Sequence, residues 1–275
     1  MMQRWPVVCA RYAGMALFAM FTLFPFLWAL SVGLSTDPSG IWHFPAAFVP
    51  VEPGAYWFKR VFAEMPFLRY VGNSLLLSAL TVAGVLALTV PCGYALAQLR
   101  FPGRRVLFGA MLLTLTLPSE VAIVPNFVTI SRLGLVDSHL GVVLPNLASA
   151  FGVFLMKQSF EQLPAEVIDA ARVDGAGEWQ VLLRVAAPLN LPAIGTLAIF
   201  TLVTAWNDYL WPAVVLTTRT RLPISVGVFN DLTGPFAVST SLVMAAVVMA
   251  VVPVIVLFAL TQRFFLAPQA LPMRG

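Results

Sequence analysis

Long runs of residues without an ionisable side chain divide this chain, and they constrain its fold more than any other feature. A helix needs about 20 apolar residues to cross the hydrocarbon core of a bilayer, and six of the runs are long enough. Only 10% of the 275 residues are charged, whereas a soluble domain is charged at about a quarter of its positions. We therefore predict an all-α, polytopic membrane protein with about six transmembrane helices.

The predicted spans belong to a single transmembrane domain that covers residues 1–275. They lie near residues 12–34, 71–98, 106–131, 139–157, 190–216 and 241–264. The first run is too long for the apolar core of a signal peptide, so we expect it to remain as an uncleaved helix. Two loops are long enough to hold structure of their own, an outer loop at 37–69 and an inner loop at 159–188.

The positions of the basic residues predict which side of the membrane each loop faces. Ten of the 16 Lys and Arg residues fall on the side of the two termini and the 159–188 loop, and six fall on the other side. Cytoplasmic loops carry the excess of Lys and Arg, so we expect both termini in the cytoplasm. The basic residues form no cluster, which argues against a nucleic-acid partner.

The inner loop is the most polar stretch of the chain, and its first half predicts a helix that ends in a turn. Pro164 suits the first turn of a helix, where its missing N–H would have no partner. Glu166 and Asp169 follow near the positive end of the helix dipole. Gly175 and Gly177 then indicate a helix stop and a turn.

The second half of the loop predicts an amphipathic helix. Trp179, Leu182, Leu183 and Ala186 recur at helical spacing and form one apolar face. Pro188 ends or kinks this helix before the fifth span begins.

The polar surface of the loop is acidic, because Lys157, Arg172 and Arg184 are outnumbered by Glu161, Glu166, Asp169, Asp174 and Glu178. Anionic lipid headgroups repel such a surface, which argues against an interfacial helix that rests on the bilayer. We therefore favour a loop that docks onto a protein partner with basic groups.

The loop resembles the EAA loop of bacterial ABC-importer permeases. The positions that match the pattern are Asp169, Ala170, Ala171, Gly175, Val185 and Pro188. Asp169 stands where the family usually has Glu, which keeps the charge and shortens its reach by one methylene. The resemblance implies that coupling to an ATPase depends on Asp169, Ala170, Ala171, Asp174, Gly175 and Pro188.

Further segments resemble the MalG-like branch of binding-protein-dependent carbohydrate permeases over nearly the whole chain. They lie at 70–74 (YVGNS), 93–97 (GYALA), 100–104 (RFPGR), 132–135 (RLGL), 206–212 (WNDYLWP) and 262–265 (QRFF). The resemblance implies a type I ABC importer permease fold in the bacterial plasma (inner) membrane. It also implies a second permease subunit, an ATPase dimer and an extracytoplasmic solute-binding protein as partners, and a carbohydrate, polyol or glycerophosphate as solute.

Polar residues inside the predicted spans are candidates for the translocation path, namely Glu120, Asn126, Asn207 and Asp208. An acid at the centre of a membrane helix costs roughly 2.5–3.5 kcal/mol on insertion scales, so Glu120 should face protein or water. A structural role is an open alternative, in which Glu120 stabilises a helix broken at Pro118 and Pro125. Asp208 lies near the predicted outer interface, where it could simply reach water.

Catalysis by the chain itself is not expected. It has no phosphate-binding loop and no dinucleotide fingerprint, so ATP and Mg²⁺ would be bound by the partner ATPase. Cys9, Cys92, His43 and His139 lie too far apart in sequence to suggest a metal site or a disulfide framework.

Two other functions compete with an importer subunit. An ion-coupled secondary transporter would use broken helices at the midplane, and Glu120 between two prolines is the feature that points to it. An intramembrane enzyme would need paired catalytic groups at one depth, and Glu120 has no evident companion in the sequence.

Overall fold

The computed structural model of the protein describes residues 5–36, 49–50, 52–232 and 239–261. Over these residues the regular structure is helical, and the extended pairing is limited to an isolated bridge between Ser35 and Pro53. The chain divides into two compact units, Met1–Leu68 with Gly227–Pro253, and Arg69–Val226 with Val254–Gly275. The single transmembrane domain expected from the sequence stays a prediction.

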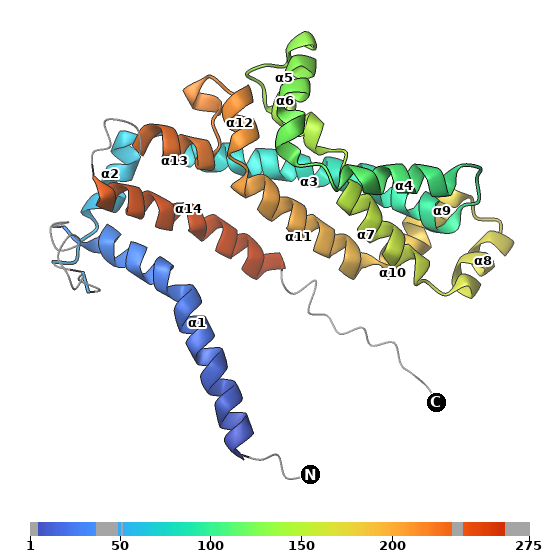
Figure 1. Ribbon diagram of the computed structural model, residues 1–275, viewed down its shortest axis with the longest axis horizontal. Helices are drawn as coiled ribbons and strands as arrows, with labels where there is room; N and C mark the ends of the chain where they lie inside the picture. Colours follow the sequence, from blue (N-terminus) through green and yellow to red (C-terminus); the bar gives the residue numbers. More distant parts are fainter. Residues whose placement is uncertain (1–4, 37–48, 51, 233–238, 262–275) are drawn as a thin grey trace. The chain divides into compact units, whose positions relative to one another are not determined.

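The first unit contains α1 (Trp5–Leu34), α2 (Tyr56–Glu64) and most of α14 (Thr240–Thr261) (Figure 1). Gly33 of α1 lies against the backbone of Ala245 of α14, where an added Cβ would be 3.2 Å from the Ala245 Cα. The Trp57 indole N–H of α2 donates to the carbonyl of Ser35 at 2.8 Å. Much of the predicted outer loop, at 37–48 and 51, lies outside the described residues.

The second unit contains α3 (Phe67–Gln98), the longest helix of the described residues, and the other helices of the unit follow it in sequence. They are α4 (Arg104–Thr114), η2 (Ser119–Ala122), α5 (Ile123–Arg132), α6 (His139–Asn146), α7 (Ala150–Glu161), α11 (Leu191–Asn207), α12 (Leu210–Val215), η4 (Arg219–Arg221) and the start of α13 (Ile224–Leu232). The predicted inner loop forms α8 (Ala165–Val173), α9 (Glu178–Val181), the π-helical turn η3 (Leu182–Ala186) and α10 (Ala187–Leu189).

A buried apolar cluster joins the inner loop to the membrane helices of the second unit. Tyr94 of α3, Phe160 of α7, Ile168 of α8 and Leu182 of η3 belong to it, each at most 3% exposed. Tyr94 and Phe160 meet edge to face, with ring centroids 5.7 Å apart. The loop is therefore held by the same core that packs α3 against α7.

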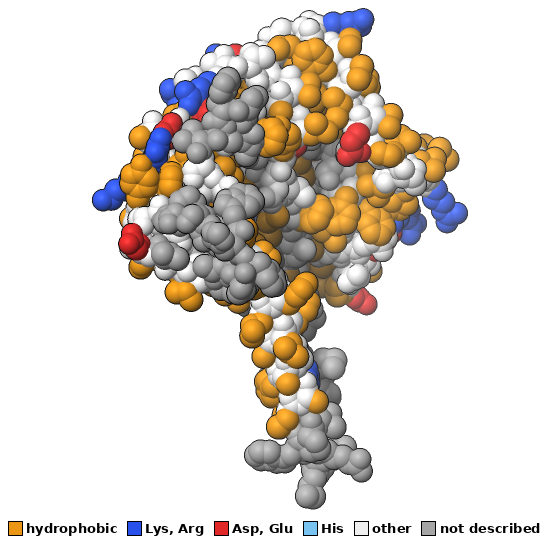
Figure 2. All heavy atoms as spheres, turned by 60° about the vertical axis from the view of Figure 1, so that its left-hand side comes forward, with side chains coloured by type: hydrophobic (Ala, Val, Ile, Leu, Met, Phe, Trp, Pro, Cys, Tyr) orange, Lys and Arg blue, Asp and Glu red, His pale blue; other side chains and the backbone are white. Residues whose placement is uncertain are grey.

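Hydrophobic side chains also cover much of the outer surface, and charged ones lie scattered at a few places on the face shown in Figure 2. Large exposed apolar residues are frequent on α1, where Phe18 is 72% and Phe21 is 81% exposed. Such a surface suits contact with lipid or with other apolar protein surfaces.

Over the described residues, three helices are long and apolar enough to cross a bilayer, namely Val8–Leu34, Phe67–Gln98 and Thr240–Leu257. Two bent pairs pass the same test when each is taken as one span. These are α6 with α7, bent by 47°, and Glu178–Leu189 with α11, bent by 82°. The second bend lies where Pro188 was expected to end or kink the loop helix.

The third predicted span, at 106–131, is not one continuous helix. Helix α4 ends at Thr114, the chain turns, and Pro118 is extended with a ψ of 134° before η2 begins. Proline has no N–H to continue the helical ladder, and it disfavours helical geometry in the residue before it. The segment is therefore divided into α4, η2 and α5.

The fifth predicted span, at 190–216, is also interrupted, so one helix running through Asp208 is not formed. Helix α11 ends at Asn207, Asp208 is extended with a ψ of 123°, and α12 begins at Leu210. The Asp208 carboxylate accepts a hydrogen bond from the Trp211 backbone N–H. A short acidic side chain that bonds backbone N–H groups ahead of it favours a new helix start over helix continuation.

Candidate functional site

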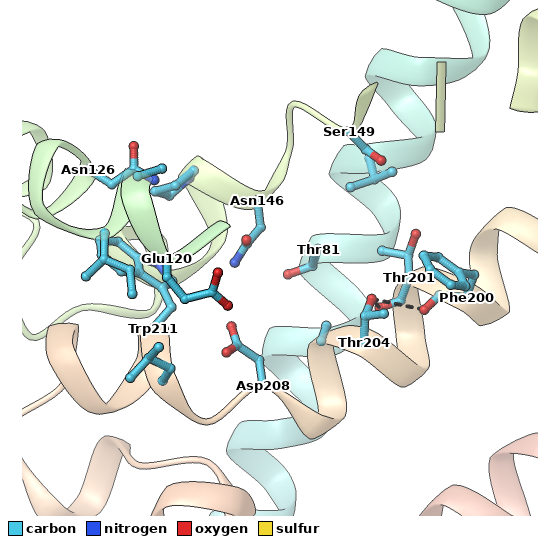
Figure 3. Close-up of a pocket in the computed structure, with 16 residues that line it drawn as sticks. Thr81, Glu120, Asn126, Asn146, Ser149, Phe200, Thr201, Thr204, Asp208 and Trp211 are labelled. Atoms are coloured by element: carbon cyan, nitrogen blue, oxygen red, sulfur yellow. Dashed lines mark hydrogen bonds between the residues drawn. The ribbon is translucent and has the colours of Figure 1, made fainter. Parts of the chain in front are cut away.

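A cavity of about 520 Å³ lies in the second unit, lined by residues of α3, η2, α5, α6, α11 and α12 (Figure 3). Glu120, which follows the break at Pro118, and Asp208, which lies at the second break, both line it. Irregular backbone at membrane depth is tolerated where it lines a cavity or is buried in protein. The cavity therefore explains why the two helices can be broken here.

Two carboxylates face each other in this cavity (Figure 3). Glu120 comes from η2 and Asp208 comes from the break between α11 and α12. The sequence left Glu120 without an evident companion, and the fold supplies one from a distant segment. Both acids point into the cavity, which gives Glu120 the polar surroundings that its position in a predicted span requires.

The other polar groups of the cavity are uncharged. Thr81 and Thr201 are buried, at 6% and 7% exposure. The Thr204 hydroxyl donates to the carbonyls of Phe200 and Thr201, each at 3.0 Å. The Asn146 amide donates to the Val142 carbonyl at 3.1 Å, and Figure 3 shows its end close to the two acids.

The remaining residues predicted for the path are placed differently. Asn126 of α5 lines the cavity together with Glu120 and Asp208. Asn207 does not line it, because its exposed amide turns back to donate to the Val203 carbonyl at 2.8 Å. Thr81 and Asn146 are cavity residues that the sequence did not single out, since neither carries a charge or a motif.

The second candidate site is the turn at the end of α8. Gly175 has a φ of +84°, the Ala176 N–H donates to Ala171 O at 3.1 Å, and the Gly175 N–H donates to Arg172 O at 3.0 Å. This pair of hydrogen bonds is a Schellman cap, which requires a left-handed residue that glycine supplies without strain. The predicted helix stop at Gly175 therefore has a defined geometry.

A hydrogen-bonded chain ties this turn to α3. The Arg172 Nε donates to Glu178 at 2.9 Å, and its Nη1 reaches Asp169 at 3.2 Å. The Tyr94 hydroxyl of α3 donates to the other oxygen of Glu178 at 2.7 Å. Hydrogen bonds from Arg172, and secondly from Tyr94, hold the pKa of Glu178 below its ordinary value.

Arg172, Glu178 and Tyr94 were not predicted as site residues. Tyr94 lies in the GYALA segment at 93–97, which carried part of the family resemblance. That resemblance was the one sequence feature that could have marked Tyr94 as a site residue. Nothing in the local spacing indicates that its hydroxyl meets a loop residue so far along the chain.

The loop has a buried side and an exposed side. Ile168, Val181, Leu182 and Ala186 are at most 2% exposed and pack into the core. The other side exposes Asp169, Ala170, Asp174, Gly175 and Pro188, and Ala171 is half-buried. The predicted apolar face of the second helix is split, because Trp179 and Leu183 are 66% and 64% exposed.

Two large apolar side chains flank the Gly175 turn in the sequence and are exposed. Val173 is 86% exposed and Trp179 is 66% exposed, on either side of the Gly175 turn. An exposed patch that mixes apolar, acidic and very small residues suits close contact with another protein.

Within the described residues, no group of three or more His, Cys, Asp and Glu side chains could hold a metal ion.

Known proteins resemble this chain over most of its length. Residues 89–267 match the family described as "Binding-protein-dependent transport system inner membrane component". The arabinooligosaccharides transport system permease protein AraQ of Halalkalibacterium halodurans is 32% identical over 236 residues, which cover 86% of this chain and 80% of AraQ. The sn-glycerol-3-phosphate transport system permease protein UgpE of Yersinia pestis is 32% identical over 254 residues, with 88% and 89% covered.

A solved structure shares the fold. It is the crystal structure of a bacterial ABC transporter involved in the import of the acidic polysaccharide alginate. One of its chains superposes with a TM-score of 0.81 and 28% sequence identity, over 95% of this chain and 96% of that chain.

Proposed function

The chain belongs to the family of binding-protein-dependent transport system inner membrane components, and we propose that it forms half of the translocation pathway of an ATP-driven importer. Family membership and the superposed transporter confirm the all-helical ABC-importer permease fold that the resemblance implied. The protein is thus a multi-pass membrane permease. The family assignment also argues against an ion-coupled secondary transporter.

The observation that carries the proposal is the exposed turn of the inner loop. Gly175 and its cap hold the turn in one shape, and the Arg172–Glu178–Tyr94 chain anchors it to α3. A force applied to this surface therefore reaches a membrane helix through hydrogen bonds and packed core rather than through a flexible linker. This rigidity is what a coupling element between an ATPase and a pore requires.

Docking onto the ATPase follows from the surface chemistry of the turn. Ala170 and Gly175 allow close approach of a partner backbone, Val173 and Trp179 offer apolar contact, and Asp169 offers a carboxylate that is two-thirds exposed. In this proposal the residues that couple transport to ATP hydrolysis are Asp169, Ala170, Ala171, Asp174, Gly175 and Pro188. ATP and Mg²⁺ are bound by the ATPase subunits, and this chain binds no cofactor.

The cavity holds the solute path in this proposal. Glu120, Asn126 and Asp208 converge there with threonine hydroxyls and an asparagine amide. The relatives are named for transport of arabinooligosaccharides and sn-glycerol-3-phosphate. A carbohydrate, polyol or glycerophosphate is therefore the solute class that we propose.

The rest of the assembly is part of the same proposal. A second permease subunit would complete the pore, an ATPase dimer would bind the inner loop, and an extracytoplasmic solute-binding protein would deliver the solute. Both termini would then lie in the cytoplasm, as the distribution of basic residues favours.

Affinity purification with a substituted turn tests the coupling role. The native chain and Gly175→Glu are each tagged and extracted in mild detergent, and co-purifying proteins are identified by mass spectrometry. We expect an ATPase with the native chain, and its loss, or loss of solute-stimulated ATP hydrolysis, in Gly175→Glu. A bulky anion at this exposed left-handed position blocks close approach and strains the cap.

Two further variants separate docking from folding. Gly175→Asn is the matched control, since Asn tolerates the left-handed region, and it should retain the ATPase. Trp179→Ala removes a side chain that is 66% exposed. This variant should capture less ATPase, while the amount of the chain in the membrane stays unchanged. A native chain that captures no ATPase, or full coupling in Gly175→Glu, would refute the proposed function.

A further inference from the structure

The ionisable side chains that line the cavity are acidic, whereas a site for an anionic solute would need basic ones. The two acidic side chains are the carboxylates of Glu120 and Asp208, and none of the residues that line the cavity in the described part of the chain is Lys, Arg or His. A cleft lined by one sign of charge repels ions of the same sign and concentrates those of the opposite sign.

The neutral lining is suited to hydroxyl groups. Thr81, Thr201 and Thr204 contribute hydroxyls, while Asn126 and Asn146 contribute amides that both donate and accept hydrogen bonds. Ionised carboxylates accept strong, charge-assisted hydrogen bonds from hydroxyl donors. Trp211 and Phe200 add aromatic surface to the same cavity, and the electron-rich faces of such rings pack against the C–H surfaces of a sugar.

We propose that Glu120 and Asp208 make this cavity selective against anions, so that the solute is an uncharged polyhydroxylated compound and not a phosphate ester or a uronate. This inference rests on the proposed function and narrows its solute class. It separates this chain from the relative named for sn-glycerol-3-phosphate and from the transporter of an acidic polysaccharide. Hydroxyl groups of the solute would donate hydrogen bonds to the two carboxylates. The solute therefore needs no positive charge to bind there.

Thiol labelling measures the potential of the cavity without knowledge of the solute. The native thiols are removed as Cys9→Ser and Cys92→Ala, and Ala205→Cys places one thiol in the cavity lining. The full-length protein in native membranes is then reacted with cationic trimethylammonium-ethyl methanethiosulfonate and with its anionic sulfonatoethyl counterpart. The rate of each reagent is divided by its rate with a free thiol in solution.

We expect the normalised rate of the cationic reagent to exceed that of the anionic one by about tenfold or more. Neutralising both acids, as Glu120→Gln with Asp208→Asn, should bring the ratio close to one. The amide oxygen introduced at position 208 can still accept the Trp211 N–H, so the start of α12 is preserved. Glu64→Gln, which removes an acid from α2 outside the cavity, is the matched control and should leave the ratio unchanged.

Two labelling results would contradict the inference. A ratio near one with both acids present, or a high ratio that the double variant leaves unchanged, would overturn the inference. If Ala205→Cys lowers the amount of protein in the membrane, Thr204→Cys serves as a second reporter from the same lining. ATP-dependent accumulation of glycerol phosphate by the assembled complex in liposomes would overturn it as well.

Failure of this inference and failure of the proposed function are distinguishable, because the labelling needs neither the ATPase nor the solute. A chain that captures an ATPase but shows a ratio of one remains an importer subunit with an unselective cavity. A chain with a tenfold ratio that captures no ATPase keeps its charged cavity and loses its proposed role.

Discussion

At the scale of single residues, Asp137 shows how one carboxylate can hold two loops together. It lies between α5 and α6, and it accepts hydrogen bonds from the Thr218 hydroxyl at 2.6 Å, the Thr218 N–H at 2.9 Å and the Thr217 N–H at 3.0 Å. The Arg221 guanidinium lies 3.0 Å from the same carboxylate. Asp137 itself has a φ of +56°, a conformation in which Asp is tolerated better than most residues.

These contacts predict a pH-dependent contribution to stability. Hydrogen bonds from Thr218, first from its hydroxyl, lower the pKa of Asp137 to about 2 from the ordinary 3.8. Because the folded-state pKa is depressed, the contribution is complete above the unfolded pKa and is lost as the pH falls through about 2. Asp137→Asn should lower the melting temperature in detergent by about 2–4 °C at neutral pH.

The melting-temperature difference between Asp137→Asn and the native chain should shrink as the pH is lowered below about 4. Glu166→Gln, a substitution of an exposed carboxylate on α8, is the control. Identical melting temperatures of Asp137→Asn and the native chain at neutral pH would contradict the role of this carboxylate.

At the scale of helices, the contact between α3 and α7 depends on the absence of a side chain at Gly93. An added Cβ there would lie 2.4 Å from the Met156 Cβ and 2.9 Å from the Lys157 backbone N. Lys157 is 9% exposed, and its ammonium group pairs with Glu161 at 2.7 Å and lies 4.5 Å from the centre of the Phe108 ring. The two helices therefore meet backbone to backbone beside an ion pair whose lysine is buried.

Gly93→Ala should destabilise the protein by about 1–3 kcal/mol, because the new methyl group overpacks a contact with rigid backbone atoms. The measurement is thermal or denaturant unfolding in detergent, followed by circular dichroism. Gly72→Ala on the same helix is the matched control. It has open space at the Cβ position and should be neutral or stabilising by up to about 1 kcal/mol, since Ala is the better helix former. Equal stability of the two variants would show that α3 and α7 are not closely packed at Gly93.

The inner loop shows that short helices are predictable where their signals are local. Pro164, Gly175 and Gly177 act on the backbone within a few residues, and the observed helix α8, its cap and the start of α9 follow them. The side of each helix that becomes buried was less predictable. Trp179 and Leu183 share helical spacing with Leu182 and Ala186, yet only the latter two reach the core.

At the scale of the whole molecule, the distribution of basic residues leads to a test of orientation. In a background without native cysteines, Ala176→Cys in the inner loop and Thr220→Cys in η4 are treated with a membrane-impermeant maleimide. We expect labelling of Thr220→Cys in intact spheroplasts, and labelling of Ala176→Cys only after the membrane is made permeable, because Lys and Arg accumulate on the cytoplasmic side. The reversed pattern would place the inner loop outside and exclude contact with a cytoplasmic ATPase.

The lipid surroundings and the class of fold follow from the hydropathy of the chain alone. Apolar runs long enough to cross a bilayer must bury their backbone polar groups in helices, whatever their neighbours are. The predicted all-α membrane fold, and the permease family read from the EAA pattern at 169–188, are confirmed by the family match and by the superposed transporter. These features depend on hydropathy and on motifs within about twenty residues, which a single sequence displays directly.

Which distant side chains meet depends on how the helices pack, and the fold was needed to see it. Glu120 and Asp208 were separate candidates in the sequence, and the breaks that follow Leu117 and Asn207 turn them toward one cavity. Tyr94 and Glu178 likewise meet through the packing of α3 against the loop. Such pairs depend on how several helices pack at once, and neither helical periodicity nor local capping carries that information.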